Sequence, residues 1–372
     1  MTKYLLFITF TFLFYIDCQS QNYLPKDTIF GNVKTIKEKV IFLTETENPQ
    51  LVSYDDYGHS GFMGPESTIA RFKNTWYTSN LCYYINYERK FDKKGNLINE
   101  VWYGKKNDFL NSYRKTYNTD NKKIKEIDST KYSNYTRTYY YSDYGDLNII
   151  EQNSKNDYFR HIFKKYNKER LTSLKEFDEN GTVDEYNYIY NKEGKLIYRV
   201  YKNPNSWKQE DERSWSYGVH DSILTVYKDI LNFYDDKNRL IKNETFDLYE
   251  DSENHITPLL TNRIENEYKN GNLVFIKSRF GIGMERYDHY TYDKLNRISE
   301  RYCCDIDKQK AMIIEKYKYN DGYISQLEYI EEGKKHKVSF KYKLDLYNNW
   351  IEIIKKVDGK DLFKWSRQIE YY

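Results

Sequence analysis

A five-residue turn motif recurs along most of this chain, and its repetition limits the folds that the chain can adopt. Eight copies carry Asp, Asn or Ser at the second position and Gly or Asn at the fifth; they begin at Phe91, Tyr117, Tyr141, Phe177, Tyr190, Tyr234, Tyr292 and Leu344. A short polar side chain at the start of a turn accepts hydrogen bonds from the backbone. The residue that closes the turn takes a positive φ, which Gly and Asn tolerate best. Each copy therefore predicts a reversal of the chain.

The sequence on both sides of these turns alternates as β-strands do. Aromatic residues occupy every second position before the turn, as in Tyr186, Tyr188 and Tyr190, and an apolar pair such as Leu196-Ile197 follows it. Alternation with a period of two residues on both sides of a reversal is typical of an antiparallel hairpin.

The hairpins recur at a nearly constant spacing. The motif starts at 91, 117 and 141, and a degenerate copy without Gly starts at Tyr166, so the steps are 26, 24 and 25 residues. The dipeptides Asn270-Gly271 and Asp321-Gly322 favour two-residue type I′ turns and add two hairpins to the series. One unit of about 25 residues thus holds two strands and two turns.

The composition agrees with a sheet. The chain has 42 Tyr and 19 Phe but only 4 Met, and aromatic residues suit strands better than helices. Roughly twenty or more strands cannot stay in one flat sheet, because the twist of each strand accumulates. We therefore predict an all-β fold of repeated antiparallel β-hairpins that form a long curved or coiled sheet, an open spiral or shell.

The first twenty residues differ from the rest. Lys3 precedes an uncharged apolar run over 5–16, and small residues precede Gln21 at positions suited to cleavage. We predict a cleaved signal peptide at 1–20, so that the mature chain is secreted, periplasmic or at the cell surface. Lipidation of Cys18 is the less favoured alternative, because Asp17 stands where such signals carry a small residue. No later apolar segment is long enough for a transmembrane helix.

The remaining chain divides into a cap and a repeat domain. Residues 21–84 match the repeat poorly and are predicted to cap the first hairpin, with a loop marked by Gly61, Gly64 and Pro65. Residues 85–372 form the repeat domain, in which the spacing widens at insertions near 202–230 and 245–262. Insertions in repeat proteins often fall on one face or edge, where partners bind.

The repeated Tyr-Asp-x-x-Gly-x-Leu pattern over 85–372 resembles the YD repeats of the RHS family and its teneurin relatives. The end of the chain, from Tyr347-Asn348-Asn349-Trp350 to Tyr372, is similar to uncharacterised secreted Bacteroidetes proteins. This resemblance implies strand ribbons that coil into a spiral shell or a long curved sheet. The chain departs from the RHS pattern because it has no long core segment of that type, no autoproteolytic site and no toxin domain after the last repeat. A toxin-carrying role is therefore not expected.

Charge and residue spacing exclude several kinds of site. Lys and Arg number 59 against 56 Asp and Glu, so no basic face for nucleic acid is predicted. The six His show no metal-site spacing and no glycine-rich loop suits a phosphate, so no metal or cofactor is expected. The many carboxylates are interpreted as a solvated strand face. For Cys303 and Cys304 we expect neighbouring buried thiols, and a bridge from one of them to Cys82 is the alternative.

The leading function hypothesis is a secreted or surface-associated interaction module without catalytic activity, which binds an extracellular glycan or protein through an aromatic edge. Tyr is first a packing residue in such strands, so the candidate binding residues are the aromatic side chains of the insertion and one strand residue: Trp207, Trp215, Tyr217, His220 and Trp102. The alternative is an extracytoplasmic hydrolase of a polymer, such as a glycosidase, on the same sheet. An outer-membrane β-barrel is a third hypothesis, disfavoured by a mean hydropathy of −0.94 and by strands in which Tyr alternates with Lys and Glu.

Overall fold

A computed structural model describes residues 27–44, 57, 61–153, 159–179, 183–203, 225–250, 256–281 and 283–372. These residues contain 22 strands of one sheet and the helix α2 (Pro65–Thr78). The strands are β1 (Val33–Phe42), β2 (Asn86–Phe91), β3 (Leu97–Tyr103), β4 (Phe109–Tyr117), β5 (Lys123–Thr130), β6 (Asn134–Tyr141), β7 (Leu147–Asn153), β8 (Phe159–Asn167), β9 (Arg170–Asp178), β10 (Val183–Tyr190), β11 (Leu196–Asn203), β12 (Thr225–Tyr234), β13 (Leu240–Glu250), β14 (Ile256–Lys269), β15 (Asn272–Phe280), β16 (Met284–Tyr292), β17 (Ile298–Cys303), β18 (Ile313–Asn320), β19 (Tyr323–Glu331), β20 (Lys334–Leu344), β21 (Trp350–Val357) and β22 (Lys360–Tyr371). The prediction of an all-β fold built from antiparallel hairpins is confirmed.

The repeated turns have the geometry that the sequence predicts. In the turn after β2, Asp92 Oδ1 accepts hydrogen bonds from the backbone N–H groups of Lys94 and Asn96, both at 2.9 Å. The closing residues of the described copies have positive φ, including 83° at Gly95 and 57° at Asn296. The degenerate copy reverses through Lys168 and Glu169, whose φ values of 46° and 68° are those of a type I′ turn without glycine.

The tyrosine that precedes a turn ties its hairpin to the previous one. Its hydroxyl donates a hydrogen bond to a backbone carbonyl near the start of the preceding strand. Six such bonds, between 2.7 and 3.1 Å, join Tyr141 to Lys123, Tyr190 to Leu171, Tyr234 to Leu196, Tyr268 to Leu240, Tyr319 to Ile298 and Tyr342 to Ile324. Tyrosine suits this position because its ring covers the sheet surface while its hydroxyl satisfies a carbonyl in the preceding strand.

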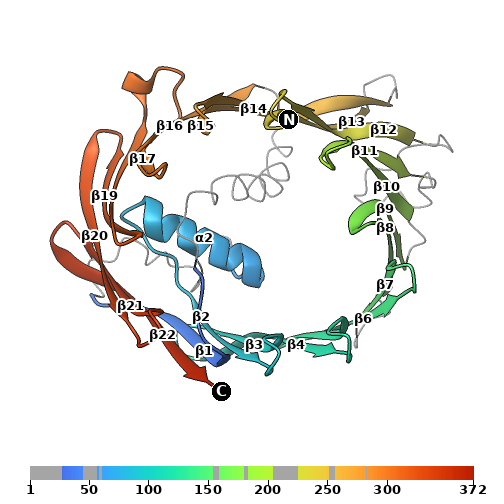
Figure 1. Ribbon diagram of the computed structural model, residues 1–372, viewed down its shortest axis with the longest axis horizontal. Coiled ribbons are helices and arrows are strands. Elements are labelled where there is room, and N and C mark those ends of the chain that lie inside the picture. Colours follow the sequence, from blue (N-terminus) through green and yellow to red (C-terminus); the bar gives the residue numbers. More distant parts are fainter. Residues whose placement is uncertain are drawn as a thin grey trace, which may run out of the picture. The chain divides into compact units, whose positions relative to one another are not determined.

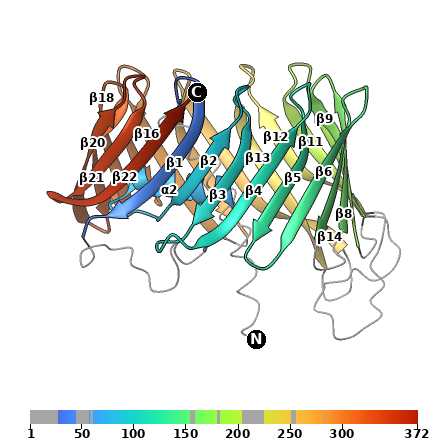
Figure 2. The same ribbon diagram turned by 90° about the horizontal axis from the view of Figure 1, so that it is seen from below.

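The two edges of the sheet carry different connections (Figure 2). Within each unit described below, the motif turns lie at one edge, which we call the turn edge; there every connection between described strands is two or five residues long. The opposite edge, which we call the loop edge, carries in the first unit the connection after β17 (304–312) and the segment with α2 between β1 and β2, and in the second unit the connection after β5 (131–133). Because successive strands run in opposite directions, successive connections lie at opposite edges of the sheet.

The first structural unit comprises residues 1–113 and 289–372. In it β1 pairs antiparallel with β2 on one side and with β22 on the other, where Ile36 lies opposite Ile369 and Val40 opposite Trp365. The first and the last strand of the succession are therefore neighbours. The expected open sheet is wrong at this point, because both end strands have a hydrogen-bonded partner on each side.

The second unit comprises residues 114–288. Its strands from β5 to β15 pair antiparallel in chain order, and register shifts between neighbours mark β-bulges, such as the one at Arg199/Val200. Bulges add local twist and let a strand ribbon bend.

The helix α2 was not predicted from the sequence, which marked a loop at Gly61, Gly64 and Pro65. Pro65 stands at the start of the helix, where its fixed φ is favourable and its missing N–H costs nothing. Figure 1 shows α2 on the concave side of the strands of its unit. Apolar side chains at Phe72 and Trp76, four residues apart, face the sheet and are fully buried. The predicted boundaries at residues 20 and 84 stay predictions.

Candidate functional site on the concave face

Aromatic rings hold α2 against the strands of the first unit. The ring of Phe72 meets that of Trp365 on β22 edge to face, at 4.7 Å between centroids, and Trp76 lies 5.6 Å from the same ring. Phe340 on β20 lies 5.6 Å from Tyr77. These contacts identify the face of Phe340 and Trp365 as the concave face (Figure 1).

A buried lysine satisfies the C-terminal end of α2. Lys355 on β21 is fully buried, and its Nζ donates to the carbonyl of Trp76 at 2.8 Å and to the carbonyl of Leu81. The last carbonyls of a helix have no partner within the helix, so a donor from a neighbouring strand satisfies them. Lys355 therefore positions the helix end over β21.

A second buried group joins the two ends of the strand succession. Arg367 on β22 donates from Nε to Glu38 Oε1 on β1 at 2.9 Å and from an Nη atom to Asp27 Oδ2 at 2.6 Å. The indole N–H of Trp365 donates to the other oxygen of Glu38 at 2.8 Å. The guanidinium also lies over the ring of Trp350, 3.5 Å from its centroid. The Arg367 guanidinium therefore connects three chain segments: β22, β1 and the segment before β1 that contains Asp27.

Protonation of Asp27, which pairs with Arg367, is expected to lower the stability of the fold in acid. Burial raises the pKa of Asp27, but Arg367 and Lys73 lower it more, and the net pKa is about 2, below the ordinary value of 3.8. A carboxylate with a lowered pKa stabilises the folded state fully above its unfolded pKa and loses that contribution as the pH falls through its folded pKa. We expect Asp27 to contribute roughly 2 kcal/mol that disappears between about pH 4 and pH 2.

The measurement is the free energy of urea unfolding at pH 5 and at pH 2.5 for the wild type and Asp27→Asn. The variant should lose less stability than the wild type between the two pH values. Equal losses would show that other carboxylates set the acid limit.

The second unit carries a row of alternating charges on its buried face. Glu126, Arg137, Glu151 and Arg160 lie directly opposite one another on the successive strands β5 to β8. Arg137 forms an ion pair with Glu151, and Glu126 accepts from Lys123 at 2.6 Å and from the hydroxyl of Tyr139 at 3.0 Å. Further along the unit, Arg199 donates to Asp229 at 2.9 Å. The carboxylates of this row are buried among their basic partners, while the side chains of Arg137 and Arg160 stay 31% and 39% exposed.

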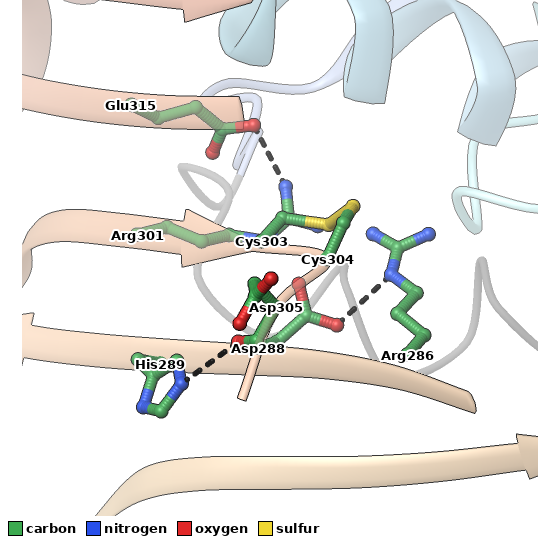
Figure 3. The surroundings of a disulfide bond; sticks show 8 residues. All are labelled: Arg286, Asp288, His289, Arg301, Cys303, Cys304, Asp305 and Glu315. Atoms are coloured by element: carbon green, nitrogen blue, oxygen red, sulfur yellow. Dashed lines mark hydrogen bonds and ion pairs between the residues drawn. A yellow bond between two sulfur atoms is a disulfide. The ribbon is translucent and has the colours of Figure 1, made fainter. Parts of the chain in front are cut away.

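A disulfide ends β17 in the first unit. Cys303 and the next residue, Cys304, are bonded to each other, and Cys304 has a φ of 82° (Figure 3). The segment beyond it is held by His289 Nε2, which donates to the carbonyl of Asp305 at 3.2 Å, while Arg301 pairs with Glu315 at 2.7 Å beside it. The expectation of two neighbouring thiols is therefore wrong.

Cys82 forms no disulfide. It is fully buried, and burial raises the pKa of its thiol to about 12, so it has little thiolate character.

Of the predicted binding residues, four lie outside the described residues: Trp207, Trp215, Tyr217 and His220. Trp102 is in β3 on the concave side, fully buried under Tyr57, Phe62 and Tyr87. Its indole N–H donates to Glu100 at 2.9 Å. The structure thus places Trp102 in the core of the first unit. Ligand binding by this set stays a prediction.

The buried charges are the residues that sequence reasoning missed. Glu126 and Glu151 are 8% and 7% exposed, so interpreting the carboxylates as a solvated face is wrong for these two. The sequence did indicate the face of Arg137. It lies two residues from Tyr135 and two from Tyr139, so in a strand its side chain is on the same face as these tyrosines.

Two kinds of site are not found among the described residues. No cluster of three or more His, Cys, Asp or Glu there is arranged to hold a metal ion. No helix in the described part of the chain is long and apolar enough to cross a membrane.

Comparisons with known proteins identify no family for this chain. No family model matches it and no curated protein matches it, so the resemblance to YD repeats stays a prediction. Among solved structures, a porin-like protein from Bacteroides uniformis is similar at 10% identity with a TM-score of 0.26, covering 91% of this chain and 98% of that one. A porin-like protein from Bacteroides vulgatus is similar at 11% identity with a TM-score of 0.18, covering 76% and 91%. At these scores the likeness carries no argument about function.

The hypothesis of a secreted or surface-associated interaction module without catalytic activity is wrong. It was built on a long curved sheet with an aromatic edge, but β1 and β22, the first and the last strand, pair with each other. The hydrolase alternative, which used the same open scaffold, is not carried further.

Proposed function

We propose that this chain is a porin-like β-barrel protein of the outer membrane. The observation that carries the proposal is the pairing of β1 with both β2 and β22, because an antiparallel meander whose last strand pairs with its first has no free edge. Sheets without edges are what a bilayer requires of strands, since hydrocarbon cannot satisfy an unpaired backbone group. The even number of 22 strands also suits such a barrel.

The distribution of connections supports a direction in the membrane. Outer-membrane barrels have short turns on the periplasmic side and longer loops outside. In each unit the Asx-type turns lie at the turn edge; in the first unit β1 starts and β22 ends there, while α2 and the nine-residue connection 304–312 belong to the loop edge. We propose that the turn edge faces the periplasm and the loop edge the exterior.

The two faces of the second unit support the same proposal. The buried face carries the charged row from Glu126 to Arg160, as a polar lumen would. The opposite face exposes large apolar side chains, among them Tyr140 and Val226 at 52% each and Ile189 at 39%, and it also carries the charged group of Lys175, Glu185 and Lys202. Exposed apolar side chains on the outward face are what a lipid-facing barrel wall requires. Passage of small polar solutes along the charged face is the function that fits this arrangement.

The first test is the location of the full chain in a Gram-negative host. We expect recovery in the outer-membrane fraction, a folded band that migrates differently from the boiled band in gel electrophoresis, and salt leakage from liposomes that contain the purified protein. Recovery in the soluble fraction without detergent would overturn the proposal.

The second test uses two positions at opposite edges of the second unit. Met284, at the loop edge, is 64% exposed, and Tyr144, in a motif turn, is 92% exposed. On intact cells a membrane-impermeant maleimide should label Met284→Cys and spare Tyr144→Cys, while both label after lysis. The reverse pattern would invert the proposed direction, and labelling of both on intact cells would contradict membrane insertion.

A further inference from the structure

The disulfide of the first unit joins two residues that are adjacent in sequence. Cys303 ends β17, and Cys304 is the first residue of the connection to β18 (Figure 3). A disulfide stabilises a fold mainly by closing a loop of the unfolded chain, and its effect grows with the length of that loop. Adjacent residues close the shortest loop possible, so this bond contributes little as a link between distant parts of the chain.

The bond coincides with an unusual backbone conformation at Cys304. Twelve described residues other than glycine have a positive φ, and all but Cys304 lie in connections of two or five residues between successive strands. In those connections a positive φ helps to reverse the chain. Cys304 has a φ of 82° within the nine-residue connection 304–312, where no tight turn requires it. A left-handed backbone is unfavourable for a residue with a side chain, so the disulfide is the constraint that accounts for it.

The backbone at Cys304 directs the first part of the connection. The carbonyl of Asp305 accepts a hydrogen bond from His289 Nε2 at 3.2 Å (Figure 3). Oδ1 of Asp305 accepts one from the N–H of Asp307 at 2.8 Å, and Oδ1 of Asp307 accepts one from the N–H of Gln309 at 2.9 Å. Because Asp305 directly follows Cys304, a rotation of the backbone at Cys304 carries the carbonyl of Asp305 away from His289.

The far end of the connection is anchored without Cys304. The N–H of Met312 donates to the carbonyl of Cys303 at 3.1 Å, and the carbonyl of Met312 accepts from the N–H of Glu332 at 2.9 Å. Ile313 then lies opposite Cys303 in the ladder between β17 and β18. Residues 305–311 can therefore change conformation while the two strands remain paired.

We infer that Cys303 and Cys304 form a reversible redox site, and that its oxidation state sets the conformation of the connection 304–312. Cys303 is fully buried whereas Cys304 is partly exposed, so a thiol from outside reaches Sγ of Cys304 first. The disulfide holds the left-handed backbone and the contact between Asp305 and His289. In the reduced form Cys304 is free to adopt an extended φ, which releases residues 305–311. This inference goes beyond the proposed function and does not depend on membrane insertion.

The reduction needs two electrons and two protons, and a dithiol supplies both. A thiolate of the dithiol attacks Sγ of Cys304, the bond between the two Sγ atoms breaks, and Sγ of Cys303 leaves as a thiolate that takes up a proton. The second thiolate of the dithiol then attacks the reductant's own sulfur in the mixed disulfide. Cys304 leaves as a thiolate and is protonated in turn, and the reductant ends as a cyclic disulfide.

The experiment compares the purified full chain before and after treatment with dithiothreitol. Alkylation followed by peptide mass analysis reports the state of Cys303 and Cys304. Reduction under native conditions should speed hydrogen exchange over residues 305–311 about tenfold and leave exchange in β17 and β18 unchanged. Trypsin should also cut after Lys310, whose side chain is 74% exposed, about tenfold faster in the reduced chain. Reoxidation should restore both rates.

Two variants separate this site from other effects of the reductant. Cys304→Ala removes the disulfide and should show the fast exchange with and without dithiothreitol. Cys82→Ala removes a buried thiol that forms no disulfide, so this matched control should respond to the reductant as the wild type does. The midpoint of urea unfolding should be nearly equal for the oxidised and the reduced chain, because the bond closes so short a loop.

Three results would overturn the inference: a disulfide that dithiothreitol cannot reduce in the folded chain, slow exchange over 305–311 in the reduced chain, or slow exchange there in Cys304→Ala. A large fall in the urea midpoint with faster exchange throughout the first unit would also overturn it, because the bond would then support the fold as a whole. Every measurement can be made in detergent or in water. Recovery of the chain without detergent would thus contradict the proposed function and leave this test unchanged.

Discussion

Replacing Arg367 with methionine is expected to lower the free energy of unfolding by about 3–5 kcal/mol, because a buried ion pair that loses one partner leaves an uncompensated charge. The Arg367 side chain is 1% exposed, and it neutralises Glu38, which is 3% exposed, and Asp27. Methionine would fill much of the space but offer no donor to either carboxylate. Urea unfolding at neutral pH measures the loss.

The matched control lies between the same two strands. Lys34 on β1 and Glu370 on β22 form an ion pair at 2.6 Å, but their side chains are 47% and 58% exposed. Exposed pairs are worth at most about 1 kcal/mol, so Lys34→Met should cost far less than Arg367→Met. Adding Glu38→Gln to Arg367→Met should recover part of the stability, since it removes one of the stranded charges. Equal costs for the two single variants would contradict the role assigned to the buried cluster.

Replacing Phe72 with alanine is expected to cost about 3–5 kcal/mol and to loosen α2 before any strand. The ring is fully buried between Trp76 and Trp365, so its removal leaves a cavity that rigid aromatic neighbours cannot fill. Hydrogen exchange should rise first over residues 65–78, because the helix has no other apolar anchor of this size on its central turn. The measurement is peptide-level exchange together with urea unfolding.

Glu66→Ala on the exposed side of the same helix is the comparison. It removes no buried area, and its effect should stay within about 0.5 kcal/mol. If Phe72→Ala increased exchange in the strands and α2 together, the helix would be part of one cooperative unit with the sheet.

Much of the fold could be predicted from local chemistry. The Asx side chain of Asp92 and the positive φ of Gly95 or Asn296 act within five residues, so the turns could be found from the sequence. The helix α2 could not, because Pro65 after two glycines also suits a loop, and the burial that selects a helix comes from Trp365, almost three hundred residues away.

The candidate site was harder to predict than the turns. The alternation around Arg137 shows which face it occupies, but whether Glu126 and Glu151 stand opposite depends on the register between strands. The same holds for Lys316 on β18. Its sequence does not reveal that it lies directly opposite Glu300 on β17 and Glu328 on β19. The disulfide at Cys303 required a left-handed backbone at Cys304 that adjacency in sequence does not reveal.

The sequence by itself determined the hairpins, their period and the tyrosines that join one to the next, because these depend on turn geometry and side-chain alternation over a few residues. Only the tertiary structure decided that β1 pairs with β22, that α2 covers one face and that charges align into rows. These depend on contacts between residues distant in sequence, where accumulated twist and register add up over many strands. The repeat sets the position of one hairpin relative to the next, and the twist and register accumulated over all hairpins decide whether the first and the last strand pair.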